Sequence, residues 1–340
     1  MSRPARTSIQ LVLVLAALLV MALAAISLLS LMLGTPNLSP SELGGIATGG
    51  GEHIARLVVL ELRLPRVLLG AVAGAMLALA GVLLQNSLRN PLAGPELLGV
   101  SAGASVVVAA ITIFHLPILW AAYPWLALGG GMASGGVVLL TMRRVGDPVR
   151  LILMGVAVGA LLYACVISIV TLGAQEDVGL LYLFLLGSLA NRMWDHFWVV
   201  LPWAAVGIPL TLLAARPLNL LQLGDDMAEG LGLRVERTRL LIFLLSAGLV
   251  AAVVAVCGPI AFVSLVAPHI ARRTLHSSDA RQVLPIAALI GAVLLVGADL
   301  IGRRLFDPLE LPVGIWTTLI GGPLLLILLR RQLSGSETGP

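Results

Sequence analysis

Lysine is absent from this sequence, and charge of either sign is scarce. All 21 basic residues are arginine, 17 residues are acidic, and charged residues make up 11% of the 340-residue chain. The phosphate-binding loop of nucleotide hydrolases needs a lysine on the β- and γ-phosphates of the nucleotide. The sequence therefore excludes that loop. If ATP drives this protein, another chain must hydrolyse it.

Cysteine is also rare, and the common catalytic motifs are missing. Cys165 and Cys257 both lie in apolar runs, where cysteine usually behaves as a small hydrophobic residue, so we expect no disulfide and no metal site. The five histidines are scattered, and neither His-Glu-x-x-His nor Gly-x-Ser-x-Gly occurs. An intramembrane enzyme consequently has no motif to support it, and we expect a non-catalytic chain.

What the chain has in abundance is apolar sequence. Hydrophobic residues make up 59% of it, and its mean hydropathy is +1.04. These values are typical of a polytopic membrane protein, which we expect to be all-α. In such a protein an excess of arginine reports orientation in the membrane, so the sequence pI near 9.8 does not indicate a nucleic-acid partner.

The apolar runs predict about ten transmembrane helices in a single domain over residues 1–340. An external loop is expected over 35–63. A 13-residue apolar run at 178–190 is too short to cross about 30 Å of hydrocarbon, and it predicts a short re-entrant or surface helix after the fifth span. The predicted spans are 9–33, 65–87, 97–114, the run ending at 141, 151–174, 197–215, two within 240–271, 283–302 and 311–329.

The run at 240–271 is long for one crossing and tight for two, and Gly258-Pro259 breaks it near the middle. Two crossings place 15 arginines on the cytoplasmic side and 6 outside, whereas one crossing gives 12 and 9. The positive-inside tendency favours two crossings. Both termini are then predicted to be cytoplasmic.

Residues 216–239 form the most polar segment between two apolar runs. Four arginines and four acidic residues occur within it, so it cannot lie in lipid. We expect a cytoplasmic loop that a soluble, energy-supplying partner contacts.

Four further polar stretches, each marked by Pro or Gly, interrupt the chain where helices are expected to meet a membrane face. They are Arg63-Leu-Pro-Arg66, Arg89-Asn-Pro-Leu-Ala93, the segment 258–269 with Gly-Pro-Ile-Ala-Phe-Val and Ala-Pro-His, and Glu310-Leu-Pro-Val-Gly314. Together with Gly187-Ser-Leu189, Leu231-Gly232 and Ala298-Asp299, they resemble the FecCD family. Its members are permease subunits of ABC importers for ferric siderophores, haem and cobalamin. The resemblance runs from Leu62 to Arg331, about four-fifths of the chain, with departures at Ser264 and Ala280.

The resemblance implies several partners in the bacterial cytoplasmic membrane. These are a second permease, identical or paralogous, two ATPase subunits that use ATP and Mg, and a periplasmic or lipid-anchored substrate-binding protein. No cofactor is expected on this chain itself. Transport is expected to proceed by alternating access, with the cargo left open among siderophore, haem and cobalamin.

The resemblance also assigns residues to three roles. The expected ATPase-coupling residues are Asp225, Ala228, Glu229, Leu231, Gly232 and Val235. The expected docking residues for the binding protein are Arg63, Arg66 and Arg303. The expected inner gate consists of Asn90, Leu92, Pro148 and Val149.

A stand-alone ion-coupled carrier or channel is the alternative. It would be expected to bury acidic residues within its spans, and Asp299 is the one candidate there. Arg303 follows four residues later, a spacing that favours a local ion pair over a proton relay.

Overall fold

The computed structural model describes residues 9–145, 148–306 and 309–336, and all regular secondary structure in these residues is helical. The α-helices are α1 (Ile9–Met32), α2 (Pro40–Ala47), α3 (His53–Leu57), α4 (Leu64–Ser87), α5 (Val100–Ile113), α6 (Tyr123–Val145), α7 (Pro148–Val170), α8 (Gln175–Leu185), α9 (Trp194–Leu213), α10 (Ala215–Gln222), α11 (Asp225–Gly230), α12 (Val235–Cys257), α13 (Val263–Leu275), α14 (Ala280–Arg304) and α15 (Val313–Ser336). A π-helical turn (Val58–Arg63) joins α3 to α4, and short 3-10 turns precede α5 and α6.

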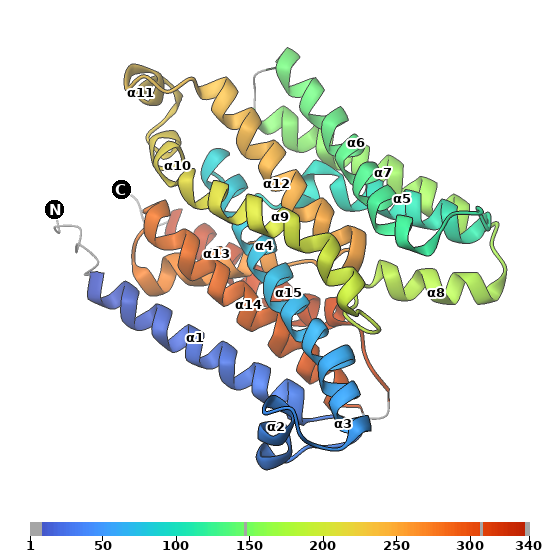
Figure 1. The fold of residues 1–340 in the computed structure, drawn as a ribbon. Helices are drawn as coiled ribbons and strands as arrows, with labels where there is room; N and C mark the ends of the chain where they lie inside the picture. Colours follow the sequence, from blue (N-terminus) through green and yellow to red (C-terminus); the bar gives the residue numbers. More distant parts are fainter. Residues whose placement is uncertain (1–8, 146–147, 307–308, 337–340) are drawn as a thin grey trace.

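Helix α4 lies at the centre of the bundle, where it packs against α14, α12, α13 and α9 (Figure 1). Gly74 on α4 faces Gly291 on α14, and a Cβ on either glycine would meet the backbone carbonyl oxygen of the other. Gly81 faces the carbonyl oxygen of Ser264 on α13 in the same way. Lipid provides no hydrophobic force that would drive helices together, so close packing has to hold them, and small residues allow it. These glycines therefore bring α4, α13 and α14 together.

Six helical stretches in the described residues are long and apolar enough to cross a membrane, so the protein is a multi-pass membrane protein. They are Ile9–Met32, His53–Ser87, Leu153–Val170, Trp194–Leu213, Val235–Cys257 and Ala280–Arg304. The predicted count of about ten spans is not reached by this criterion, and it stays a prediction along with the side of the termini.

The apolar run at 240–271 divides as the Gly258-Pro259 pair predicts. Helix α12 ends at Cys257, and Gly258 adopts a positive φ of 73° before α13 begins at Val263. The two helices are unequal, because α13 has 13 residues and spans about 20 Å at about 1.5 Å per residue. A full eighth crossing is therefore not provided by α13 alone.

Short helices occupy two segments that the apolar pattern set apart. Helix α8, 11 residues long, begins three residues before the run predicted at 178–190 and ends within it. Helices α10 and α11 lie in the polar segment 216–239.

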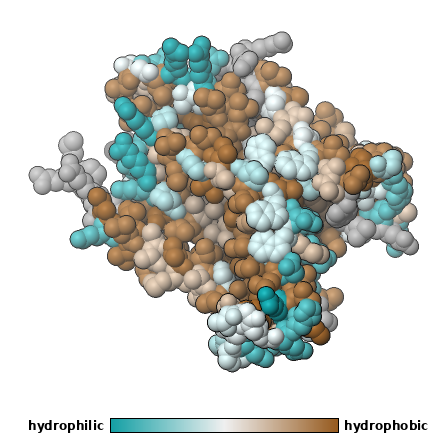
Figure 2. Space-filling view, in the orientation of Figure 1, coloured by the Kyte–Doolittle hydropathy of each residue, from teal (hydrophilic) through white to brown (hydrophobic). Residues whose placement is uncertain are grey.

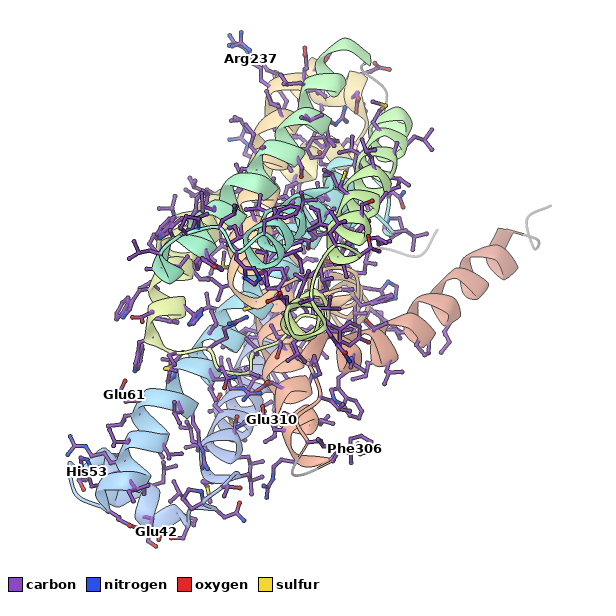
Figure 3. The ribbon with its side chains drawn as sticks, turned by 90° about the vertical axis from the view of Figure 1, so that its right-hand side faces the viewer. Glu42, His53, Glu61, Arg237, Phe306 and Glu310 are labelled. Atoms are coloured by element: carbon purple, nitrogen blue, oxygen red, sulfur yellow. The ribbon has the colours of Figure 1, made fainter. Side chains whose placement is uncertain are left out.

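Hydrophilic side chains gather at opposite ends of the molecule, and the side between them is mainly apolar (Figure 2). Glu42, His53 and Glu61 lie at one end, and Arg237 lies at the other (Figure 3). We call these the α2 end and the α11 end. The separation of the two ends by an apolar side matches a chain that crosses lipid.

Candidate functional site

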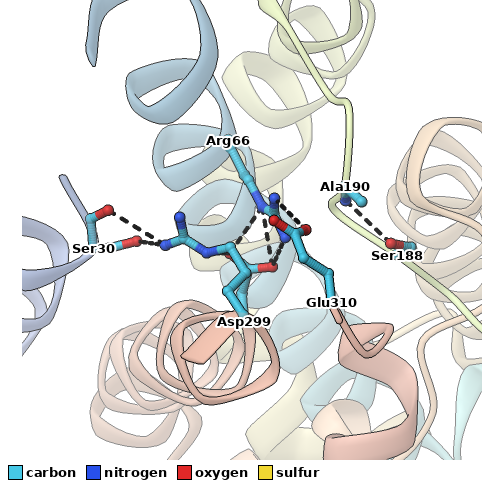
Figure 4. Close-up of polar contacts among 7 residues, drawn as sticks. Ser30, Arg66, Ser188, Ala190, Asp299 and Glu310 are labelled. Carbon is cyan, nitrogen blue, oxygen red and sulfur yellow. Dashed lines mark hydrogen bonds and ion pairs between the residues drawn. The ribbon is translucent and has the colours of Figure 1, made fainter. Parts of the chain in front are cut away.

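A buried cluster of charged side chains lies near the α2 end, with Arg66 at its centre (Figure 4). Arg66, at the start of α4, donates hydrogen bonds to Asp299 of α14 through Nε (3.0 Å to Oδ2) and Nη2 (2.9 Å to Oδ1). Its Nη1 donates to Glu310 Oε2 at 2.9 Å, in the segment before α15. The side chain of Asp299 is 5% exposed and that of Glu310 is 47% exposed. Arg66 thus ties α4 to the end of α14 and to the connection that leads into α15.

Asp299 also pairs with Arg303, as the four-residue spacing predicts. Arg303 Nε lies 3.3 Å from Asp299 Oδ2, and the Arg303 guanidinium donates to the hydroxyl and carbonyl oxygens of Ser30 in α1. The local ion pair is confirmed. Because two arginines share this one buried carboxylate, the carboxylate is engaged from two sides.

Arg63 is the last residue of the π-helical turn before α4, and its side chain is buried against the connection between α1 and α2. It donates to the carbonyl oxygens of Leu31 (2.7 Å), Met32 (3.3 Å) and Pro36 (2.7 Å), and 6% of its surface is exposed. These bonds satisfy carbonyl groups at the end of α1 that have no intrahelical partner. Arg63 therefore fixes where the chain turns after its first helix.

A cavity of about 330 Å³ opens beside this cluster. Among its described lining residues Glu310 is the one acidic residue, and the basic ones are Arg63, Arg66, Arg192, Arg303 and Arg304. The Nε atom of Arg192 is buried and has no hydrogen-bond partner within the described part of the chain. The excess of positive charge in a recess favours anionic groups.

The three arginines expected to dock a binding protein do not form an exposed rim. Arg63 is 6% exposed, and the side chains of Arg66 and Arg303 are 12% and 8% exposed. Carboxylate and carbonyl partners within the chain hold all three. Docking through them stays a prediction, and it would act through the cavity.

A second charged cluster lies at the α11 end and is built on Asp225, the first residue of α11. Asp225 accepts hydrogen bonds from Arg239 of α12 (2.9 and 3.2 Å) and from Arg89 after α4 (3.2 Å). The hydrogen bonds from Arg239 lower the pKa of Asp225 below its ordinary value, and the charges of Arg239 and Arg89 act in the same direction. Asp225 thereby links α11 to α12 and to the break after α4.

The remaining expected coupling residues divide into exposed and buried ones. Glu229, Leu231 and Gly232 are exposed, with Leu231 at 60%. Ala228 and Val235 are 0% and 5% exposed, so they pack inside this chain, and their role in coupling stays a prediction. In the segment 216–239 the large exposed apolar side chains are those of Leu231, Met227 and Leu223, and the last two are 64% and 57% exposed.

The end of α11 explains why some of these residues are exposed and others are buried. Gly232 has a φ of 86°, its N–H donates to Glu229 O, and the N–H of Leu233 donates to Ala228 O. This left-handed glycine terminates α11. Ala228 and Val235 therefore lie on opposite sides of a turn and do not share one helix face.

The expected inner-gate residues lie at two places. Asn90 and Leu92 follow α4, where Asn90 Oδ1 accepts a hydrogen bond from Leu92 N at 2.9 Å and closes the turn. Pro148 and Val149 open α7, and their side chains fall outside the described residues. Their role as a gate stays a prediction.

Sequence reasoning missed Arg239 and the partnership of Arg66 with Asp299. Arg66 and Asp299 stand 233 residues apart, so no local spacing joins them. The signal that could have found them is the presence of one acidic and one basic group in neighbouring apolar spans, since such groups usually pair with one another.

Comparisons with known proteins agree on one family. A family model described as the FecCD transport family matches residues 17–331. The chain is 42% identical over 315 residues to the Fe(3+) dicitrate transport system permease protein FecD of Escherichia coli (strain K12), which covers 92% of this chain and 96% of the relative. It is 43% identical over 282 residues to the hemin transport system permease protein HmuU of Yersinia pestis, covering 80% and 83%.

The fold is shared with a solved structure as well. An inward-facing conformation of a metal-chelate type ABC transporter superposes with a TM-score of 0.82 at 28% sequence identity, covering 93% of this chain and 98% of that one. With the family model matching nearly the whole chain and with relatives above 40% identity, this protein belongs to the FecCD transport family.

Proposed function

We propose that this chain is the permease subunit of a binding-protein-dependent ABC importer in the bacterial cytoplasmic membrane. It moves an iron-siderophore complex, haem or cobalamin inward by alternating access. The relatives named for ferric citrate and hemin support the ferric chelate and haem members of this range. The observation that carries the proposal is the family match over residues 17–331, in a chain that has no lysine for a nucleotide-binding loop of its own.

In the proposed assembly two permeases stand over two ATPase subunits, which bind ATP and Mg. The exposed turn after α11 meets the ATPase, and Leu231 is the apolar side chain that it presents. Asp225 then passes the movement on, because its carboxylate holds both α12 and the break after α4. A displacement of α11 consequently reaches two long helices at once.

At the opposite end, the binding protein docks over the arginine-lined cavity. Acidic side chains on its lobes would enter the cavity beside Arg192 and Arg66. Charge complementarity of this kind mainly sets encounter rate and register. Selection of the cargo then rests largely with the binding protein.

The ATPase contact is tested by one substitution at each end of the molecule. Leu231→Arg places a charge on the exposed turn, and Leu305→Arg makes the same change at the end of α14 on a side chain of nearly equal exposure (60% and 59%). We expect Leu231→Arg to abolish co-purification of the ATPase and Leu305→Arg to preserve it, with both variants inserted in the membrane. Normal ATPase association of the Leu231 variant would contradict the proposal.

An ion-coupled carrier finds less support. Its one predicted coupling acid, Asp299, accepts hydrogen bonds from Arg66 and lies against Arg303. Two guanidinium groups of this chain thus occupy the carboxylate, which is the arrangement of a structural ion-pair cluster.

A further inference from the structure

A second cavity, of about 250 Å³, lies at the α11 end of the bundle. Its walls come from four elements: the last turn of α4, the break after it, the end of α10, and α13 with the segment that leads into α14. The polar and charged residues that line it are Gln85, Asn86, Arg89, Gln222, Arg272 and Ser278. Among its described lining residues none is acidic.

Arg272 is the cation that distinguishes this cavity. Its guanidinium donates to two amide oxygens of α4, Gln85 Oε1 and Asn86 Oδ1, the latter at 3.4 Å. Within the described residues it has no carboxylate partner. A partly buried guanidinium held by neutral groups keeps its full charge available to an anion.

The acidic residues closest to this cavity along the chain are engaged elsewhere. Asp225 is held by Arg89 and Arg239, and Asp279 accepts from Asn219 Nδ2 (2.6 Å) and from the N–H of Arg281 (2.9 Å). Neither lines the cavity. Among the residues that the structure describes, no carboxylate therefore compensates the charge of Arg272.

A buried donor points to the same conclusion. Asn86 is 6% exposed, its Oδ1 faces Arg272, and its Nδ2 is buried without a hydrogen-bond partner in the described part of the chain. An unpaired buried donor costs free energy, and such groups in native proteins are usually satisfied by an acceptor. Asn86 also lines the cavity, so an oxygen-rich anion there would supply the counter-charge for Arg272 and, after a rotation of the amide, an acceptor for Nδ2.

The position of the cavity relative to the membrane narrows the choice of anion. Its lining residues lie where helices end: α4 stops at Ser87, α10 stops at Gln222, and α14 starts at Ala280. Basic side chains near the ends of membrane helices tend to reach the headgroup layer of a bilayer, where lipid phosphates are concentrated. Basic pockets between membrane helices bind phosphate-bearing headgroups. The volume equals that of about eight water molecules at about 30 Å³ each, which gives a phosphate group ample room.

We propose that this cavity is a phosphate-binding site in which Arg272 and Asn86 hold the phosphate oxygens, with Arg89 at the mouth. The phosphate belongs to an anionic phospholipid headgroup or to free phosphate. Once bound, it joins α13 and the break after α4 to Gln222, the last residue of α10. A bound phosphate therefore stabilises the junction from which α11 projects.

The chain provides a matched pair of arginines for the test. Arg272 lines the cavity, and its neighbour Arg273 is exposed and does not. The full-length permease is placed in phosphatidylcholine nanodiscs, with or without phosphatidylglycerol, and bound phosphatidylglycerol is counted by native mass spectrometry. Arg272→Gln should weaken phosphatidylglycerol binding at least about tenfold, since one charge-assisted pair is lost, whereas Arg273→Gln should change it less than about twofold.

A second arm separates the two sources of phosphate. Inorganic phosphate is titrated into phosphatidylcholine nanodiscs, with chloride at matched ionic strength as the control, and the thermal midpoint is recorded. An Arg272-dependent rise with phosphate alone identifies free phosphate, and Arg272-dependent retention of phosphatidylglycerol without such a rise identifies the lipid. Equal effects of the two glutamine variants would show surface charge only and would overturn the proposal, as would an absence of binding in both arms.

A further pair of variants protects the test against misfolding of Arg272→Gln. Ser278 is an exposed residue at the wall, so Ser278→Asp adds a negative charge there and Ser278→Asn adds none at the same size. We expect the aspartate variant to lose binding in the responding arm and the asparagine variant to keep it. Equal binding by these two variants would also overturn the proposal.

Discussion

Asp299 should be far more important to stability than Glu310, although both carboxylates lie 2.9 Å from the same arginine. The Asp299 side chain is 5% exposed and faces two guanidinium groups, those of Arg66 and Arg303, which are 12% and 8% exposed. Asp299→Asn would leave both cations buried without their shared counter-charge. Removing one partner of a buried ion pair costs about 3–5 kcal/mol.

Glu310→Gln is the matched control. The Glu310 side chain is 47% exposed, and water screens its attraction to Arg66. Exposed ion pairs contribute about 0–1 kcal/mol. The two substitutions are the same chemical change on two acceptors of one arginine, so their difference isolates the effect of burial.

The assay is thermal unfolding of the purified permease in one detergent, followed by tryptophan fluorescence. At about 2–4 °C per kcal/mol, the midpoint should fall on the order of 10 °C for Asp299→Asn and no more than about 4 °C for Glu310→Gln. Adding Arg303→Gln to Asp299→Asn should restore part of the loss, because one uncompensated cation is removed. Equal midpoints for the two single variants, or no recovery in the double variant, would refute this reasoning.

Two further predictions follow from the helix contacts and from the α11 end. Gly81→Ala should destabilise the protein by about 1–3 kcal/mol, because the added methyl group would meet the carbonyl oxygen of Ser264. Gly136→Ala should be nearly neutral, since nothing lies within 4 Å of the new Cβ. Expression level and thermal midpoint measure both effects, and equal losses in the two variants would argue against a close approach of α4 and α13 at Gly81. Asp225 should stabilise the α11 end only while it is ionised. Its folded pKa is lowered, so its contribution is present above the ordinary value of about 3.8 and disappears as the pH falls through the folded value. Protection against hydrogen exchange over 225–239, taken relative to the intrinsic exchange rate at each pH, should fall at that low pH, and Asp225→Asn should show the lower protection already at pH 7. Unchanged protection in the variant would contradict this stabilising role of Asp225.

The sequence predicts the helical class and most helix positions because apolar length is a strong local signal. The break at Gly258 and the short helix near 178–190 follow from Pro, Gly and run length in the same way. The number of membrane crossings does not follow from run length, because α13 is too short to span alone and because α3 continues through the π-helical turn into α4. Run length alone cannot distinguish a half-crossing from a full one.

The sequence likewise predicts the local contacts of the charged residues and not the distant ones. The pair of Asp299 and Arg303 lies on one helix turn, so its spacing predicts it. Arg66 reaches the same carboxylate from a distant helix, and the burial of Arg63 depends on the turn after α1, which sequence spacing does not describe. The expected coupling residues divide into exposed and buried ones for a different reason: Gly232 ends α11 in a left-handed conformation, so the residues before and after it do not share one helix face.

The two charged clusters suggest how movement crosses the molecule in the proposed cycle. Asp225 fastens α11 to α12 and to the break after α4, while Arg66 fastens the other end of α4 to α14. Helix α4 is thereby held by an ion pair near each end and packed closely between them. We expect it to move as a rigid element between the ATPase contact and the cavity at the α2 end.

The central claim is that this permease is powered by a separate ATPase. Its most direct test is uptake of a ferric chelate into proteoliposomes that contain the permease, with the binding protein outside and ATP inside, measured with and without the cognate ATPase. We predict accumulation against a gradient only when the ATPase is present and ATP is supplied. Equal accumulation by the permease alone would contradict the claim.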